Sequence, residues 1–189
     1  MTTTLVLGGP RSGKSRHAQS LLEAHPQVTF VATCVTPDPA ADPDLTSRIA
    51  RHQERRPQGW RTVETLDLTR ALLSSRQPVV VDDLASWVLG QFDQNDLWAD
   101  QHRARQVIDD LVDEFTLALR AVPVDVVTVS HDPAWVRQLD DPRERLYADL
   151  LAHVNQRVSA VSQHVHAIVG GRVLDLSAAP VVGTWAAQR

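Results

Sequence analysis

The segment from Gly8 to Ser15 combines glycines, a lysine and a hydroxyl at a spacing suited to phosphate chemistry. Glycines allow successive backbone N–H groups to turn inward onto phosphate oxygens, the lysine can reach the outer phosphates, and the Ser15 hydroxyl can ligate Mg²⁺. The alternative is a plain glycine turn before a helix. Because an apolar run precedes the segment and an amphipathic stretch follows it, we predict a Walker A phosphate-binding loop formed by Gly8, Gly9, Pro10, Arg11, Ser12, Gly13, Lys14 and Ser15.

Lys14 is the only lysine among the 19 basic residues of the chain. The other basic residues are all arginine, whose planar guanidinium does not replace a compact ammonium at every site. A phosphate-binding loop is one position where the ammonium is needed. The bias in composition therefore supports the same prediction as the motif.

Asp82 is the candidate carboxylate partner of this loop. It follows the apolar run Pro78 to Val81, so we expect it at the carboxyl end of a buried parallel strand, where open α/β sheets bind ligands. There it could hold Mg²⁺ together with Ser15. Asp83 competes for this role, and the Asp-Asp pair could instead cap a helix through Leu84 to Leu89.

A second segment, Arg48 to Glu64, places a histidine among cations. At helical spacing His52 shares one side of a helix with Arg48, Arg51 and Arg55. Neighbouring cations lower the pKa of an imidazole, and a neutral imidazole near a triphosphate is a competent nucleophile toward phosphorus. The alternative is a solvated basic helix face on which the histidine is incidental.

Short apolar runs alternate with helix-length amphipathic stretches along the chain. The runs are nearly continuous, as in buried parallel strands, and cover Thr3–Leu7, Val28–Ala32, Val79–Val81, Val124–Val129 and Val165–Val169. The predicted helices are Lys14–Ala24, Leu45–Arg55, Leu66–Ser74, Ala99–Ala121 and Arg143–Gln163. This alternation predicts an α/β fold, a P-loop NTPase-like open and mostly parallel sheet flanked by helices. We expect one domain over residues 1–176 and a C-terminal extension over 177–189.

The amino-acid composition limits which partners and which cellular compartment we expect for this protein. The net charge of −4 over 189 residues predicts no nucleic-acid partner. With Cys34 as the single cysteine, the chain has no demand for an oxidising compartment. The sequence shows neither a secretion signal nor a long apolar span, so we expect a cytoplasmic protein without membrane insertion.

Two motifs carry a resemblance to a known family. The first is Gly8-Gly9-x-Arg11-Ser12-Gly13-Lys14-Ser15, and the second is Arg48-Ile49-x-x-His52-x-x-x-Arg56-Pro57-x-x-Trp60-x-Thr62-x-Glu64. With these motifs, and with fainter similarity up to about Leu176, the chain resembles the bifunctional adenosylcobinamide kinase and adenosylcobinamide-phosphate guanylyltransferase family.

The resemblance implies a function and a set of site residues. In that family the histidine at the position of His52 attacks the α-phosphate of GTP, expels pyrophosphate and carries GMP covalently. A kinase step first phosphorylates the aminopropanol hydroxyl of adenosylcobinamide, and GMP transfer then gives adenosylcobinamide-GDP. The implied substrates and cofactor are ATP, GTP and Mg²⁺, and the family forms homotrimers. The residues implied to contact the nucleotide or its metal, beyond the glycine loop, are Thr33, Cys34, Gln53, Glu54, Arg55, Arg56, Glu64 and Asp82.

Two loops depart from the family pattern. After the fourth predicted strand the family typically shows Thr-Asn-Glu-Val-Gly, whereas this chain reads Ser130-His131-Asp132-Pro133-Ala134. After Asp82 the usual Cys-Leu-Thr becomes Asp83-Leu84-Ala85. Both loops face the acceptor substrate in the family. Although Ser130-His131-Asp132 contains the residue types of a hydrolase triad, neighbouring residues at a strand end point to different sides and cannot form that relay.

Two other functions remain open at the level of sequence. One is a P-loop small-molecule kinase with a different acceptor, and the other is a non-catalytic GTP-binding relative that serves as a sensor or partner subunit. His164 and His166 share one strand face, but two ligands without a third make a weak metal site.

Overall fold

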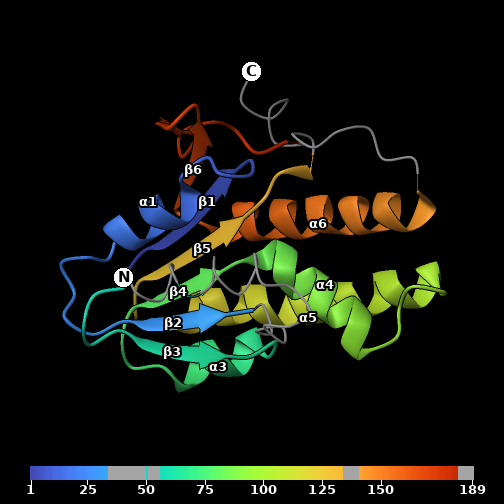
Figure 1. The fold of residues 1–189 in the computed structure, drawn as a ribbon, viewed down its shortest axis with the longest axis horizontal. Coiled ribbons are helices and arrows are strands. Elements are labelled where there is room, and N and C mark those ends of the chain that lie inside the picture. The colour runs from blue at the N-terminus through green and yellow to red at the C-terminus, as the bar shows by residue number, and fades with distance from the viewer. Residues whose placement is uncertain (34–49, 51–55, 134–140, 183–189) are drawn as a thin grey trace.

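The computed structural model describes residues 1–33, 50, 56–133 and 141–182, and its core is a seven-stranded sheet (Figure 1). The strand order is β3-β2-β4-β5-β1-β6-β7. Every neighbouring pair is parallel except β6 and β7, which are antiparallel. The strands are β1 (Thr3–Gly8), β2 (Thr29–Ala32), β3 (Arg61–Glu64), β4 (Val79–Asp82), β5 (Val126–Ser130), β6 (His164–Val169) and β7 (Arg172–Asp175). The predicted α/β, mostly parallel sheet is therefore confirmed.

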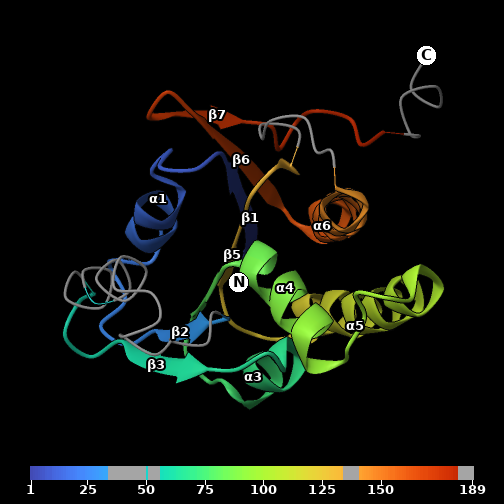
Figure 2. The same ribbon diagram turned by 45° about the vertical axis from the view of Figure 1, so that its right-hand side comes forward.

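Helices cover both faces of the sheet, but unequally. Figure 2 shows α1 on one face and α3, α4, α5 and α6 on the other. Each of the four helices on the second face begins at an aspartate whose carboxylate accepts a backbone N–H of the first turn. The helices are α1 (Lys14–Ser20), α3 (Leu68–Ser74), α4 (Leu84–Gln94), α5 (Gln101–Ala121) and α6 (Pro142–Val161), and the capping residues are Asp67, Asp83, Asp100 and Asp141.

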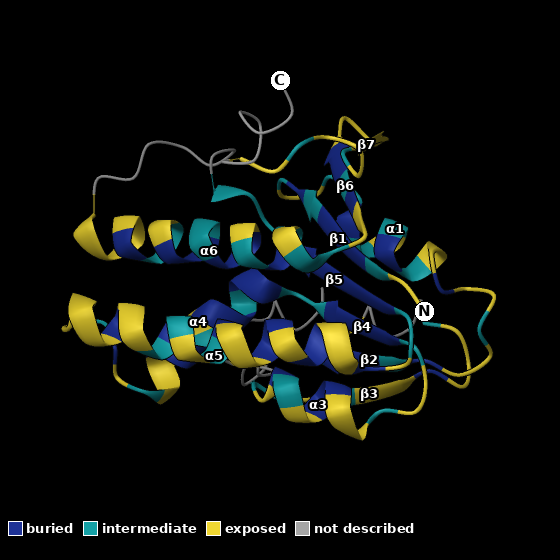
Figure 3. Cartoon of the chain, turned by 180° about the vertical axis from the view of Figure 1, so that it is seen from behind, coloured by how far each residue is buried: buried dark blue, intermediate teal, exposed yellow. Residues whose placement is uncertain are grey.

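The central strands are apolar along their whole length because both of their faces are covered. Leu5 belongs to the larger core cluster, beneath α3 to α6, whereas the next residue, Val6, belongs to the smaller cluster beneath α1. The neighbours Val79 and Val80 divide in the same way. Figure 3, which is coloured by burial and seen from the side of α3 to α6, shows that these helices are exposed on their outer surfaces and cover buried strands.

The predicted elements match the structure, with informative differences at the edges. All five predicted strands are present, within one or two residues of their predicted bounds. Helix α1 ends at Ser20, four residues before the predicted end. The predicted helix Leu45–Arg55 lies outside the described residues, except for Ala50. The sequence pattern missed β3 and β7 because these edge strands are mostly exposed and lack a continuous apolar run. It also underestimated α4, which extends five residues beyond Leu89. Within the described ranges no helix is long and apolar enough to cross a membrane.

Gly59 lies in the turn that follows Arg56, and its replacement by alanine is expected to destabilise the protein. Its φ is +102°, and an added Cβ would lie 2.6 Å from the carbonyl oxygen of Pro26. Gly171 is the matched control, because its φ is +73° but its Cβ would meet open space. We expect Gly59→Ala to lower the free energy of unfolding by about 2–4 kcal/mol and Gly171→Ala by about 1 kcal/mol, measured by urea denaturation. Equal effects would show that the contact with Pro26 is unimportant.

Candidate nucleotide-binding site

The predicted site residues that the structure describes converge on the carboxyl edge of the sheet. Because β1 to β5 run parallel, the residues at their carboxyl ends meet at the same edge (Figure 1). The glycine loop follows β1, Thr33 follows β2, Glu64 ends β3 and Asp82 ends β4. The strand register is consistent with this arrangement, since Ala32 of β2 pairs with Glu64 on one side and Asp82 on the other.

The glycine loop has the backbone geometry of a phosphate-binding loop. Arg11 and Gly13 both have positive φ, 57° and 98°, so the chain turns sharply before α1. The Ser12 Oγ is buried and has no hydrogen-bond partner within the described residues. Gly8 leaves room for this loop, because an added Cβ would lie 2.5 Å from Ser12 Oγ. A sharp turn before a helix, with a buried hydroxyl that has no partner among the described residues, fits a phosphate group.

The hydroxyl and carboxylate predicted to hold a metal ion contact one another. Ser15 Oγ donates a hydrogen bond of 3.2 Å to Asp82 Oδ1. Burial and the neighbouring Asp83 carboxylate raise the pKa of Asp82 to about 6, although the Ser15 hydroxyl, Lys14 and Arg56 oppose this shift. One carboxylate and one hydroxyl at this spacing fit a Mg²⁺ ion, which takes few protein ligands and completes its shell with water and phosphate oxygens.

Arg56 reaches the same edge of the sheet from the turn before β3. Its guanidinium carbon lies 3.6 Å from the centroid of the Phe30 ring, and its Nη1 donates to Thr62 Oγ1 at 2.5 Å. Burial lowers the pKa of Arg56, while the charges of Asp82 and Glu64 raise it. The Nε is buried without a hydrogen-bond partner in the described part of the chain, so it is available to an anion.

Asp82 and Asp83 are the two candidate metal ligands, and their side chains have different hydrogen-bond partners. Asp83 Oδ1 accepts from the backbone N–H of Ser86 at 2.8 Å and caps α4. The Thr33 hydroxyl holds the same residue, donating to the Asp83 carbonyl oxygen at 2.6 Å. Asp82 therefore contacts the glycine loop, whereas Asp83 performs the capping that the sequence left as an alternative. The peptide bond between them is cis.

A residue that the sequence analysis did not select also lies at this edge. His131 follows β5 directly, and its Nε2 lies 3.0 Å from Asp83 Oδ2. The two residues are 48 positions apart, so no local pattern could have paired them. The strand order is the missing information, because β5 lies between β4 and β1.

Several predicted site residues lie outside the described residues. They are Cys34, His52, Gln53, Glu54 and Arg55. Their assignment therefore depends on the family resemblance alone.

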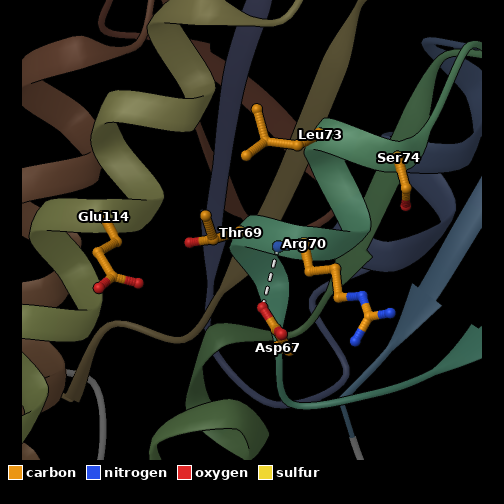
Figure 4. A pocket seen from close by; sticks show the side chains of 6 residues that line it. All are labelled: Asp67, Thr69, Arg70, Leu73, Ser74 and Glu114. Carbon is orange, nitrogen blue, oxygen red and sulfur yellow. Dashed lines mark hydrogen bonds between the residues drawn. The ribbon is translucent and has the colours of Figure 1, made fainter.

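Two features elsewhere do not contribute to this site. His17 Nε2 lies 3.0 Å from His166 Nδ1, but within the described ranges no three His, Cys, Asp or Glu side chains come together to hold a metal ion. An open hollow of about 460 Å³ lies between α3 and α5 (Figure 4). None of the residues that line it was predicted to bind nucleotide; they are Asp67, Thr69, Arg70, Leu73, Ser74 and Glu114.

The raised pKa of Asp82 predicts how stability depends on pH without metal or nucleotide. Since the native pKa is about 6 and the ordinary value 3.8, the folded protein binds this proton more tightly than the unfolded chain does. The free energy of unfolding should therefore fall as pH rises from about 4 to about 6, by about 1–3 kcal/mol from this group. Asp82→Asn should remove that decline. Urea denaturation in EDTA across this pH range measures the difference, and parallel profiles for the two proteins would contradict the prediction.

The fold and the site together define a P-loop nucleotide-binding protein. A parallel sheet, a glycine loop after its first strand and a carboxylate that meets the loop hydroxyl are the features of this class.

Comparison with known proteins identifies the family within this class. The family model described as cobinamide kinase / cobinamide phosphate guanyltransferase matches residues 4–176. The bifunctional adenosylcobalamin biosynthesis protein CobU of Salmonella typhimurium is 32% identical over 177 residues, covering 88% of this chain and 95% of its own length. The protein of the same name from Escherichia coli is 30% identical with the same coverage. The bifunctional adenosylcobalamin biosynthesis protein CobP of Pseudomonas aeruginosa is 30% identical over 182 residues, covering 94% of this chain and 98% of its own.

The chain therefore belongs to the cobinamide kinase / cobinamide phosphate guanyltransferase family, and it is an enzyme. The resemblance inferred from the two motifs is confirmed.

Proposed function

We propose that this enzyme phosphorylates adenosylcobinamide and then transfers GMP from GTP to adenosylcobinamide phosphate, giving adenosylcobinamide-GDP. The proposal is carried by the family match over residues 4–176, together with the meeting of Ser15 and Asp82 beside the glycine loop.

In the kinase step, the chain positions the terminal phosphate of ATP or GTP for attack by the aminopropanol hydroxyl. The backbone N–H groups of the loop and the Lys14 ammonium hold the outer phosphates. Lys14 is 8% exposed and close enough to influence the pKa of both Asp82 and Asp83, so its charge acts within a partly desolvated site. Ser15 and Asp82 would hold Mg²⁺, which supplies charge neutralisation between the donor phosphates.

In the guanylyl step, we propose that His52 is the nucleophile. A neutral imidazole nitrogen attacks the α-phosphorus of GTP, the bond from that phosphorus to the β-phosphate oxygen breaks, and pyrophosphate leaves. A phosphate oxygen of adenosylcobinamide phosphate then attacks the same phosphorus and releases the imidazole. We propose that a further set of residues contacts the guanine nucleotide, namely Thr33, Cys34, Glu64 and the run Gln53 to Arg56. Arg56 contributes a buried Nε that has no hydrogen-bond partner among the described residues.

The proposed function is tested by following both conversions with the purified enzyme. Adenosylcobinamide incubated with ATP and Mg²⁺ should gain the mass of one phosphate, and subsequent addition of GTP should add the mass of GMP with release of pyrophosphate. Liquid chromatography with mass spectrometry measures both products. Phosphorylation of a different alcohol, with adenosylcobinamide untouched, would indicate a kinase for another acceptor. Nucleotide binding without turnover would indicate a non-catalytic relative.

We further propose how the chain is organised and where it acts. The transferase domain spans residues 1–176, followed by an extension over 177–189. The resemblance supports a homotrimer, and the single cysteine, Cys34, is compatible with the cytoplasm.

A further inference from the structure

The contact between His131 and Asp83 joins the two loops in which this chain departs from its family. At these two positions the chain carries an aspartate and a histidine. The structure brings the two side chains together, with His131 Nε2 at 3.0 Å from Asp83 Oδ2. The two loops thus place a carboxylate and an imidazole in direct contact.

The pair lies beside the phosphate-binding loop. Residue Ser130 at the end of β5 pairs with Leu7 of β1, one residue before Gly8. On the other side of β5, Val129 pairs with Asp82. His131 therefore emerges between the start of the glycine loop, which would hold the donor phosphates, and the carboxylate that meets Ser15.

The contact fixes the proton arrangement on the imidazole. Asp83 Oδ1 accepts the backbone N–H of Ser86 at 2.8 Å, and its other oxygen, Oδ2, faces His131 Nε2 at 3.0 Å. An ionised carboxylate only accepts hydrogen bonds, so Nε2 carries the hydrogen of this contact. In a neutral ring, Nδ1 then carries a lone pair, and within the described residues it has no hydrogen-bond partner. The side chain is 30% exposed, so a hydroxyl can reach it.

Neighbouring residues hold both members of the pair in place. Asn155 of α6 donates from Nδ2 to the His131 carbonyl oxygen at 2.7 Å, and the Tyr147 hydroxyl of the same helix donates to the Ala85 carbonyl at 3.2 Å. The second oxygen of Asp83 is occupied by the Ser86 N–H. The carboxylate therefore has one orientation, and so has the ring that it contacts.

We propose that His131 is the general base of the kinase step and that Asp83 is its positioning residue. As the acceptor oxygen forms its bond to the γ-phosphorus, the bond from that phosphorus to the leaving nucleoside diphosphate breaks, and the hydroxyl proton moves to His131 Nδ1. Asp83 stabilises the resulting imidazolium, which returns the proton to solvent. This inference depends on the proposed kinase function.

Asp83→Asn is the decisive variant. The Asn oxygen can retain the cap on Ser86, which directs its NH₂ group toward His131 and forces Nε2 to accept. The hydrogen of a neutral ring then moves to Nδ1, which loses its lone pair although the contact persists. We expect kcat for phosphorylation to fall roughly 100-fold or more, with the KM for adenosylcobinamide changed less than about three-fold. His131→Asn should produce a similar loss.

The half-buried pair His153 and Asp109 provides a matched control, since its Nε2 to Oδ1 distance is 2.8 Å and it joins α6 to α5. His153→Asn and Asp109→Asn should leave phosphorylation unchanged. Labelling of the protein by α-phosphate-labelled GTP should persist in all four variants, which shows that nucleotide still binds.

The possible outcomes separate the two proposals. A wild-type enzyme that does not phosphorylate adenosylcobinamide would overturn the proposed function. An active wild type whose Asp83→Asn and His131→Asn variants keep full kcat would overturn only the role of the pair. Loss of kcat in Asp132→Asn, with His131→Asn fully active, would place the base at the next residue.

Discussion

Replacement of His52 by alanine is expected to abolish transfer of the α-phosphate of GTP to the protein. The proposed covalent step has no nucleophile without this imidazole, so we expect the rate of guanylyl transfer to fall roughly 1000-fold or more. Incubation with α-phosphate-labelled GTP, followed by denaturation and gel separation, measures the adduct directly. A phosphorus to nitrogen bond should also be lost in acid and stable in base.

The kinase step supplies the internal reference for this variant. Phosphorylation of adenosylcobinamide uses the terminal phosphate, so His52→Ala should retain it within a few-fold. His102→Ala removes an exposed histidine on α5 and should retain the full label. Persistent acid-labile label in His52→Ala would identify a different nucleophile.

Replacement of Lys14 by methionine is expected to impair both steps. Methionine keeps most of the side-chain length but removes the charge that stabilises the outer phosphates and the leaving pyrophosphate. Because that charge acts in a partly desolvated loop, we expect kcat of each step to fall roughly 100- to 1000-fold. Both rates follow from the mass-spectrometric assay of product formation.

Arg16→Met is the matched control for charge. Arg16 lies two residues further along α1 and is exposed, so its loss changes the net charge equally without removing a cation from the loop. We expect both rates to stay within two-fold of wild type. If Lys14→Met impaired only the kinase step, GTP would have to bind at a second place for guanylyl transfer.

Much of the site could be predicted from sequence because its chemistry is local. The glycine loop directly follows an apolar strand, and Asp82 directly follows another, so neighbouring residues were enough to place both at the carboxyl edge. The parallel sheet follows from the same runs. The contact between Ser15 and Asp82 is the product of these two local predictions.

The parts that sequence missed depend on strand order and on solvent exposure. The exposed strand β3, which carries Glu64, has only Val63 as an apolar residue and so lacks a recognisable pattern. Asp83 and His131 meet only because β5 is inserted between β1 and β4. The sequence analysis considered only neighbouring residues as partners of His131, whereas the carboxylate that it contacts is Asp83, the N-cap of α4, which directly follows β4.

The unequal helical layers distribute local stability unevenly across the molecule. Helix α1 is seven residues long and buries only Lys14 and Ala18, and within the described residues the cluster beneath it is the smaller of the two. Release of α1 would thus expose little of the large cluster, and such a segment opens at a lower free energy than the core does. A ligand bound at the glycine loop adds its binding free energy to the folded state. Nucleotide binding at the glycine loop is therefore expected to stabilise α1, the helical layer with the lower local stability.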